Sequence, residues 1–322
     1  MTQFAPIAIV GRGCVLPGAL SPAELWDVVA EGEDCVTSVP EERWLVPPEA
    51  IMTDADDPAA ERTWSDRGGY VRGFDERFDA ADYDLEADAV RRADPLLRWL
   101  LYAGGEALAE AGLRGATDPA RSGAIVGNLS YPTESLIEWA HGVWRGDQQG
   151  EARNRFMSGL PISEMAAGLG LGGPSFAIDS ACASSLYAIK LACDRLQEGS
   201  ADVMLAGGIN RADDLYLHVG FSSLKALSQS GQSRPFHAEA DGLLPAEGAG
   251  VVALRRLEDA IDDGQPIHGV IRGIGLSNDG RGDGILSPSP AGQIRAMRAA
   301  YGDEVSPESV SFLECHATGT PV

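Results

Sequence analysis

The sequence predicts an α/β fold in which helices cover both faces of a mixed or parallel sheet. Short, continuously apolar segments alternate along the chain with segments of helical periodicity, which is typical of strands buried on both sides. The chain has 322 residues, enough for a large core, and its 39 glycines suit many tight turns between strands and helices. We therefore expect an α/β architecture rather than a helical bundle.

The first strand is expected at residues 7–10, followed by a loop. Gly11 and Gly13 could begin a dinucleotide-binding turn, but Leu16 stands where that motif requires another glycine. A plain strand-to-loop turn is therefore favoured.

A short helix is expected next. Ser21 can serve as its N-cap, with Pro22 at the first helical position and Glu24 at the third, which together form a capping box. Residues 40–80 are rich in Pro, Asp and aromatic side chains with little periodicity, so an irregular excursion is expected there.

The remaining elements follow the same alternation. Helices are expected at 95–111, in part of 151–173, after residue 182 as far as Gly199, and at 292–301. The further strands are expected at 123–129, 175–180, 201–209, 248–257, 267–280 and 309–316.

Composition excludes several classes of function. The net charge is −23, so the chain lacks the basic excess that nucleic-acid binding requires. No apolar run of about 18 residues is present, so no membrane span is expected. The start also lacks the pattern of a signal peptide. An acidic partner would need a local basic patch. Arg91, Arg92 and Arg98 are one candidate, and a solvated helix face explains them at least as well.

The five cysteines include no C-x-x-C pair, and their number is odd. That pattern argues against a disulfide framework or a zinc site and for a reducing, cytoplasmic location. No metal site is expected. Cys193 falls inside an expected helix, where it should be a small buried hydrophobe.

The segment "FAIDSACASSLYAIKLACDRL" places Cys182 between an expected strand and an expected helix. Leu186, Ile189, Cys193 and Leu196 are spaced three and four apart, which is one face of a helix. The unpaired N–H groups and the dipole at a helix start stabilise a thiolate and can hold the oxyanion of an attacked thioester. From position alone, a nucleophile and a structural cysteine are about equally favoured.

A partner for that sulfur is offered by "SFLECHATGT". The expected strand ends at Leu313, and the chain then passes His316 into a Gly/Thr loop. Because reacting groups gather at strand ends in α/β sheets, His316 can meet Cys182. A lone loop histidine is more often structural. The other histidines lack such a setting: His141, His218, His237 and His268.

Several motifs carry a family resemblance. "DSACASSLYAIKLACDRL" resembles the active-site segment of β-ketoacyl synthases, the condensing enzymes of fatty-acid and polyketide assembly. "ECHATGTPV" is similar to their first histidine motif, and "GFSSLKALSQSGQSRPFHAEADGLLPAEGAG" to the segment between the two. "IAIVGRGCVLPGALSPAELWDVVAEGEDCVTSVPEERW" resembles the opening of type I, multidomain members. "GNLSYPTES", "GLSNDGRGDG" and Ala317 most resemble the subgroup in polyunsaturated-fatty-acid synthases and related iterative polyketide enzymes.

The resemblance implies the thiolase-like fold, an α/β/α/β/α sandwich of two similar halves that is normally a homodimer. We expect the N-terminal half at residues 1–265 and the start of the C-terminal half at 266–322. An acyl carrier protein is the implied partner, with further synthase domains downstream. No directly bound cofactor is implied, because the carrier's phosphopantetheine arm delivers the substrate.

The resemblance also implies roles for single residues. Cys182 matches the acyl-accepting nucleophile, and His316 matches the first of two histidines that assist decarboxylation of a malonyl thioester. Thr318 and Thr320 match threonines that bind the phosphopantetheine arm, and Phe221 lies where the family lines its acyl pocket. The implied activity is that of an acyltransferase that performs decarboxylative Claisen condensation.

The sequence departs from the family pattern in two places. It stops at Val322, before the family's lysine segment, second histidine and Gly-Phe-Gly loop, so the second half is expected to be incomplete. Losing a single oxyanion donor costs about 100- to 1,000-fold in rate, so we expect these 322 residues alone to be inactive in condensation. Pro245-Ala246-Glu247-Gly248 also stands where Gly-Glu-Gly is common, with an expected structural effect only.

Three functions therefore stay open. The first is a condensing enzyme, or the part of one that carries the nucleophile. The second is a non-catalytic partner of the chain-length-factor type, which Cys182 argues against and the missing C-terminal motifs argue for. The third is a Cys–His thioester hydrolase or acyltransferase, which is disfavoured because no Gly-x-Cys-x-Gly elbow is present.

Overall fold

The computed structural model describes most of the chain: residues 4–41, 43–44, 46–54, 61–147, 151–211, 214–281, 287–302 and 305–320. Residues 282–284 of "GLSNDGRGDG" and the last two residues of "ECHATGTPV" lie outside the described residues. Within the described ranges, no helix combines the length and hydropathy needed to cross a bilayer.

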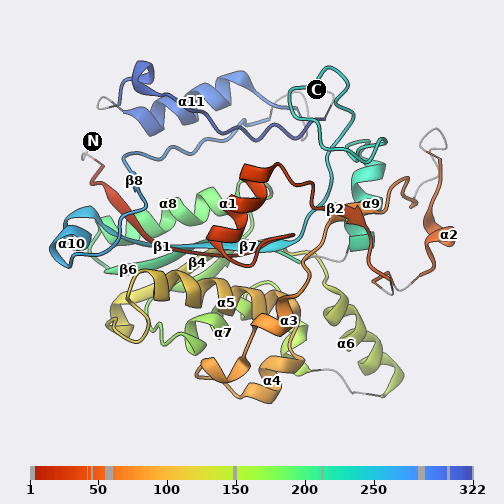
Figure 1. The fold of residues 1–322 in the computed structure, drawn as a ribbon, viewed down its shortest axis with the longest axis horizontal. Helices are drawn as coiled ribbons and strands as arrows, with labels where there is room; N and C mark the ends of the chain where they lie inside the picture. Colours follow the sequence, from red (N-terminus) through yellow and green to blue (C-terminus); the bar gives the residue numbers. More distant parts are fainter. Residues whose placement is uncertain are drawn as a thin grey trace.

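A six-stranded mixed sheet forms the centre of the molecule, in the order β5-β4-β6-β7-β1-β8 (Figure 1). β4 pairs in parallel with β5 and β6, whereas the pairs β6–β7, β7–β1 and β1–β8 are antiparallel. The carboxyl ends of β4, β5 and β6 therefore lie at the same end of the sheet as the amino end of β7. The strands are β1 (Ile7–Val15), β4 (Ser122–Asn128), β5 (Ser175–Ile178), β6 (Val203–Asn210), β7 (Gly248–Arg256) and β8 (Gly269–Ile271).

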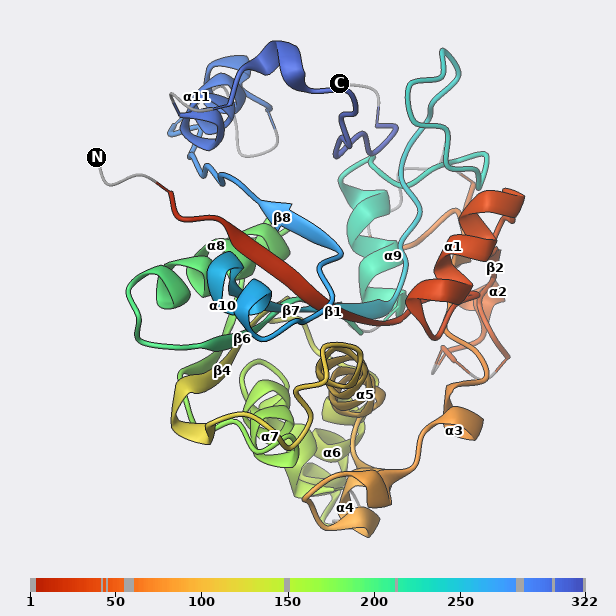
Figure 2. The ribbon, with the colours of Figure 1, turned by 60° about the vertical axis from the view of Figure 1, so that its left-hand side comes forward.

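Helices cover both faces of this sheet (Figures 1 and 2). α5 (Pro95–Glu110) and α7 (Leu160–Gly168) pack on one face, and α8 (Ser184–Gln197) packs on the other, with α11 (Pro290–Tyr301) farther out on that side. Side chains alternate along β6, so Val203 and Leu205 join the core under α5, whereas Met204 and Ala206 join the core under α8. The expected two-sided α/β architecture is confirmed.

Close packing between β1 and α5 explains the glycines near the start of the chain. A Cβ on Gly11 would lie 1.9 Å from the carbonyl oxygen of Ala107, and one on Gly13 would lie 2.1 Å from that of Ala103. Only glycine lets strand and helix approach this closely. These glycines belong to the strand itself, which continues to Val15, so the prediction of a loop after residue 10 was wrong.

α1 (Pro22–Glu31) begins as predicted, with Ser21 Oγ accepting a hydrogen bond from the Glu24 amide at 3.2 Å. The Glu24 carboxylate accepts from the Leu20 amide at 2.6 Å instead of from the N-cap's own amide, so the capping box is displaced by one residue. The irregular excursion is confirmed. The described part of this segment carries short elements: α2 (Pro48–Ile51), β3 (Arg67–Gly69), which pairs with β2 (Val36–Ser38), and α3 (Phe74–Arg77).

Two expected strands near the end of the chain are not found as predicted. Of residues 267–280, only the three of β8 pair with a neighbour. Residues 309–316 contain no strand, and there Phe312 is 77% exposed and Leu313 62% exposed. An apolar segment becomes a strand only where another strand supplies backbone partners, and none of the described strands pairs with this one.

Several helices were not predicted. One of them, α9 (Asp214–Ser223), follows β6 and contains Phe221 of the family motif. The other described elements are η1 (Ala80–Asp82), α4 (Ala87–Arg92), η2 (Pro119–Arg121), α6 (Glu134–Arg145), η3 (Ala152–Phe156), α10 (Leu257–Asp262) and η4 (Pro307–Ser309).

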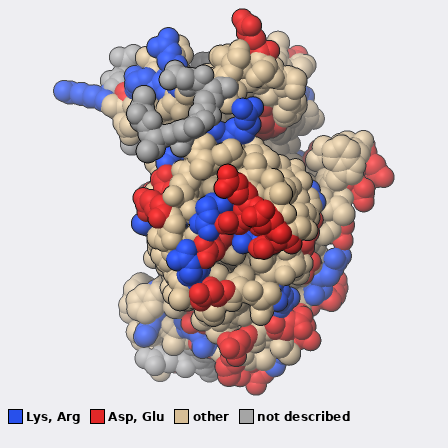
Figure 3. All heavy atoms as spheres, turned by 90° about the vertical axis from the view of Figure 1, so that its left-hand side faces the viewer, with Lys and Arg blue, Asp and Glu red and all other residues tan. Residues whose placement is uncertain are grey.

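The candidate basic patch at Arg91, Arg92 and Arg98 is neutralised by ion pairs. Each of these arginines contacts a carboxylate, which favours the interpretation of a solvated face over that of a docking site. Figure 3 shows a similar mixture on another face of the molecule, where basic side chains lie among acidic ones. In the candidate patch, the pairs are Arg91 with Asp88, Arg92 with Glu151, and Arg98 with Asp75.

Candidate active site

Cys182 lies on the turn between β5 and α8, as the sequence predicted. The strand ends at Ile178 and the helix begins at Ser184, so the sulfur precedes the helix by two residues. Cys182 is exposed. Its neighbour Ala181 has a φ of 48°, a left-handed conformation that side chains other than glycine rarely adopt. The turn is therefore sharp, and it presents the cysteine to solvent rather than to the core.

Hydrogen bonds from the first residue of α8 hold this turn. The buried Ser184 hydroxyl accepts from the Ser180 amide at 2.8 Å and donates to the carbonyl oxygen of Ala181 at 2.6 Å. Ser184 also packs on β4 at Gly127, where an added Cβ would lie only 2.6 Å from the Cβ of the serine. The position of the cysteine is thus fixed against the sheet.

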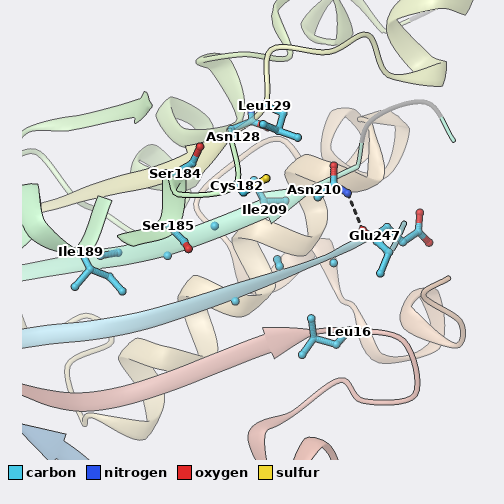
Figure 4. A pocket seen from close by; sticks show the side chains of 18 of the residues that line it. Leu16, Asn128, Leu129, Cys182, Ser184, Ser185, Ile189, Ile209, Asn210 and Glu247 are labelled. Atoms are coloured by element: carbon cyan, nitrogen blue, oxygen red, sulfur yellow. Dashed lines mark hydrogen bonds between the residues drawn. The ribbon is translucent and has the colours of Figure 1, made fainter. Parts of the chain in front are cut away.

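A cavity of about 520 Å³ opens at this end of the sheet, and Cys182 lines it (Figure 4). Its walls come from the ends of β4 and β6, the start of β7 and the first turn of α8. Asn128 and Asn210 project from the two strand ends, and Glu247 lies just before β7. The cavity therefore gathers polar groups from distant parts of the chain around one exposed sulfur.

His316 lines a second cavity, of about 370 Å³, together with Phe221 and Thr318. The two cavities share part of their walls, so Cys182 and His316 line neighbouring spaces, as their predicted partnership requires. The residues common to both walls are Leu129, Asn210 and Ala246.

The loop that carries the histidine is held by its own contacts. The hydroxyl oxygens of Thr318 and Thr320 lie 2.9 Å apart, and the Gly242 amide donates to the carbonyl oxygen of Gly319 at 3.0 Å. Gly319 has a φ of 76°, so the turn requires a residue that tolerates the left-handed region. Thr318 faces the second cavity, whereas Thr320 contacts Thr318 and is not among the lining residues.

Sequence reasoning missed a buried charged cluster beside the first cavity. The side chain of Glu247 is 3% exposed, and one of its oxygens accepts from the Val71 amide at 2.8 Å. Its other oxygen contacts the Arg43 guanidinium and lies 3.3 Å from Arg211 Nε. Arg211 is 5% exposed and also lies 3.7 Å from a carboxylate oxygen of Glu134. The sequence signal that could have revealed this cluster is an acidic residue, Glu247, directly before an apolar strand.

Two asparagines at strand ends were missed as well. Asn128 Nδ2 donates to the carbonyl oxygens of Met157 and Ser158, at 2.7 and 2.9 Å. Asn210 Nδ2 donates to that of Ala246 at 2.6 Å (Figure 4). Each of these asparagines ties a cavity-lining strand end to the segment that faces it.

Cys193 is buried, as predicted, and so is Cys14, whereas Cys35 is half-buried and Cys315 is exposed. Burial raises the pKa of the Cys193 thiol to about 12, and that of Cys14 to about 11. His218 is buried, and its Nε2 lies 3.2 Å from the carbonyl oxygen of Arg67, which is a structural setting. Within the described ranges, no group of His, Cys, Asp and Glu is arranged to hold a metal ion.

Comparison with known families identifies both parts of the chain. Residues 5–260 match the model of the β-ketoacyl synthase N-terminal domain. Residues 268–322 match the model of the β-ketoacyl synthase C-terminal domain.

Relatives and solved structures agree with this assignment. A PKS-NRPS hybrid synthetase of Aspergillus candidus, acdB, is 36% identical over 323 residues, which cover 98% of this chain and 12% of the relative. The structure of the PfaC keto synthase–chain length factor matches with a TM-score of 0.93 and 36% identity, covering 98% of this chain and 36% of that one. An oxazolomycin ketosynthase domain of Streptomyces albus JA3453 matches with a TM-score of 0.87 and 30% identity, covering 98% and 55%.

The chain thus spans only a fraction of the length of the curated relatives it matches. The similarity to solved ketosynthases confirms the thiolase-like fold class. Together with the two family models, it shows that this chain belongs to the β-ketoacyl synthase family, the condensing enzymes of polyketide synthases and related assembly lines.

Proposed function

We propose that Cys182 accepts an acyl chain from an acyl carrier protein and that this chain is extended there by decarboxylative Claisen condensation. One observation carries the proposal. The cysteine is exposed on a sharp turn, lines a cavity at the strand ends, and that cavity shares a wall with the one that His316 lines. A structural cysteine would not need such a position.

The first step is transfer of the acyl group. Cys182 Sγ attacks the carbonyl carbon of the acyl thioester, so a new S–C bond forms and the bond to the phosphopantetheine sulfur breaks. The proton of the cysteine thiol leaves with the phosphopantetheine thiol. Backbone N–H groups at the start of α8 are suited to hold the oxyanion formed in between.

The second step is condensation. Malonyl thioester loses its carboxyl group as CO₂, and the electron pair of the broken C–C bond stays as an enolate. The enolate carbon attacks the carbonyl of the Cys182 thioester, a C–C bond forms, and the cysteine leaves as a thiolate. His316 acts as a neutral donor to the enolate oxygen, a role that its place beside the second cavity supports.

The other predicted residues have matching places in this proposal. Thr318 lines the second cavity and touches Thr320, so the pair would bind the phosphopantetheine arm. Phe221 lines the same cavity and would contact the acyl chain. A carrier protein, a second copy of the chain and further synthase domains are the proposed partners, in a cytoplasmic synthase that makes a polyketide or a polyunsaturated fatty acid.

A non-catalytic role of the chain-length-factor type is the second candidate. It is favoured by the similarity to a solved protein that combines a keto synthase with a chain length factor. Retention of the exposed Cys182 argues against it.

Mass spectrometry distinguishes these functions. The chain is incubated with acyl carrier protein loaded with an acyl group, and then with malonyl carrier protein. We expect an acyl adduct on Cys182, because acylation needs only this one of the proposed residues. The adduct should be lost in Cys182→Ala and kept in Cys315→Ala, the matched control at the other exposed cysteine.

Each outcome has one meaning. A β-ketoacyl product supports the condensing enzyme. Free acid indicates a thioester hydrolase. A wild-type chain that forms no adduct with any acyl group overturns the proposal and leaves the non-catalytic partner.

A further inference from the structure

Asp179 is the residue that follows β5, and its carboxylate joins two segments that meet at the first cavity. Its Oδ1 accepts from the Ala181 amide at 3.0 Å, within the cysteine turn. Its Oδ2 accepts from the Ser130 amide at 3.1 Å, in the loop that follows β4. One side chain thus holds both the residue before Cys182 and the residue after Leu129.

Each of these two segments faces the reacting space. Leu129 lines both cavities, and Cys182 lines the first. The two oxygens of a carboxylate are fixed about 2.2 Å apart by covalent geometry, so both amides are held in a set relation to each other. The position of the sulfur relative to the shared wall therefore depends on this group.

The backbone of this turn is strained, so hydrogen bonds from its surroundings must hold it. The Ala181 conformation lies in the left-handed region, which is strained for an alanine and persists only where its surroundings over-determine it. Ser184 holds the amide of Ser180 and the carbonyl of Ala181, whereas Asp179 holds the amide of Ala181. Among these bonds, those of Asp179 tie the strained residue to the loop that follows β4.

We propose that Asp179 is a positioning residue of the condensing site, which fixes Cys182 against the Leu129–Ser130 wall for attack on the acyl thioester. This inference rests on the proposed function of Cys182. Asp179 does not touch the substrate in this scheme, and it acts only through the two amides that it holds.

Asp179→Asn is the test, because the amide has the same shape but only one accepting oxygen, and its NH₂ group faces an N–H donor. The rate constant of Cys182 acylation is measured at saturating acetyl-, butyryl- and octanoyl-pantetheine by intact-protein mass spectrometry. We expect this rate constant to fall by about tenfold or more, since small displacements of a nucleophile are costly. The half-saturating concentration and the thermal midpoint should stay close to those of the wild type.

Asp118→Asn is the matched control. Asp118 is also exposed and makes the same bond to the amide two residues on, at 3.0 Å to Ala120, but at the other end of β4. Its acylation rate constant should stay within about twofold of the wild type, because no cavity-lining segment depends on it.

Four outcomes separate the hypotheses. A wild type that forms no adduct overturns the proposed function, and this inference with it. A wild type that is acylated, with an equally fast Asp179→Asn variant, overturns only the positioning role. A lowered thermal midpoint with an unchanged rate constant indicates a structural role and also contradicts it. A rate loss that disappears in high salt would show that the charge acts, not the two hydrogen bonds.

Discussion

The buried charges around Glu247 should make a measurable contribution to the free energy of unfolding. Glu247→Ala removes the carboxylate that accepts from the Val71 amide and contacts both Arg43 and Arg211. The two guanidinium groups then repel each other in a place where the removed side chain was 3% exposed. The segment after β3 also loses the side-chain bond from the Val71 amide, although backbone bonds of Gly69 to Pro245 and Glu247 still join it to the start of β7.

The size of the effect follows from the burial of each partner. Removing one member of a buried ion pair costs about 3–5 kcal/mol, because the remaining charge stays buried. Arg43 is 17% exposed and can regain some water. Arg211 is 5% exposed and keeps the distant Glu134 carboxylate at 3.7 Å and the Trp99 ring, whose centroid lies 5.6 Å from its guanidinium carbon. We therefore expect the free energy of unfolding to fall by about 3 kcal/mol, near the lower end of that range.

Urea unfolding followed by circular dichroism measures this difference. Glu110→Ala is the control, because Glu110 also accepts from a backbone amide and pairs with an arginine, Arg12, but is 31% exposed. Glu110→Ala should lower the free energy of unfolding by about 1 kcal/mol or less. A Glu247→Ala variant that unfolds within about 1 kcal/mol of the wild type would refute the argument that these charges are desolvated and mutually dependent.

Two further predictions concern packing and pH. Gly13→Ala should destabilise the fold by about 3 kcal/mol, because its Cβ would lie 2.1 Å from the backbone oxygen of Ala103, and thermal unfolding measures the loss. Asp202 pairs with Arg121 and Arg256, and the Arg121 hydrogen bond in particular lowers its pKa from the usual 3.8. The contribution of Asp202 to stability should thus be complete above about pH 4 and decline as the pH falls below that value. Asp202→Asn should therefore lower the free energy of unfolding by about 1 kcal/mol at pH 7 and by less in acid.

Both of these predictions have matched controls. Gly250→Ala should be nearly neutral, because no atom lies within 4 Å of the added Cβ, and equal losses at Gly13 and Gly250 would contradict the packing argument. Asp263→Asn removes a more exposed partner of an arginine, 59% exposed, and should change stability little at any pH. An Asp202→Asn deficit that is the same at pH 3 and pH 7 would contradict the linkage.

Local pattern in the sequence was enough for much of the fold. The apolar runs predicted the strands β4, β6 and β7. β4 is buried throughout and β6 along most of its length, as expected of strands covered on both faces, whereas β7 is buried in part. The spacing of Cys193 and Leu196 placed them on the covered face of α8, whereas Leu186, from the same predicted face, is 57% exposed. The same local signals put Cys182 on the turn before that helix, and the motif around His316 indicated the family resemblance.

What the tertiary structure alone decided depends on contacts between distant segments. The antiparallel placement of β7 and β1 beside β6, the pairing of Glu247 with two arginines, and the wall shared by the two cavities have no local signature. Residues 309–316 have a strand-like pattern and form no strand, because pairing requires a neighbour that the pattern cannot supply. Periodicity records which face of a segment avoids water. Strand order, buried charge pairs and the neighbouring cavities of Cys182 and His316 are set by chain packing over long sequence separations.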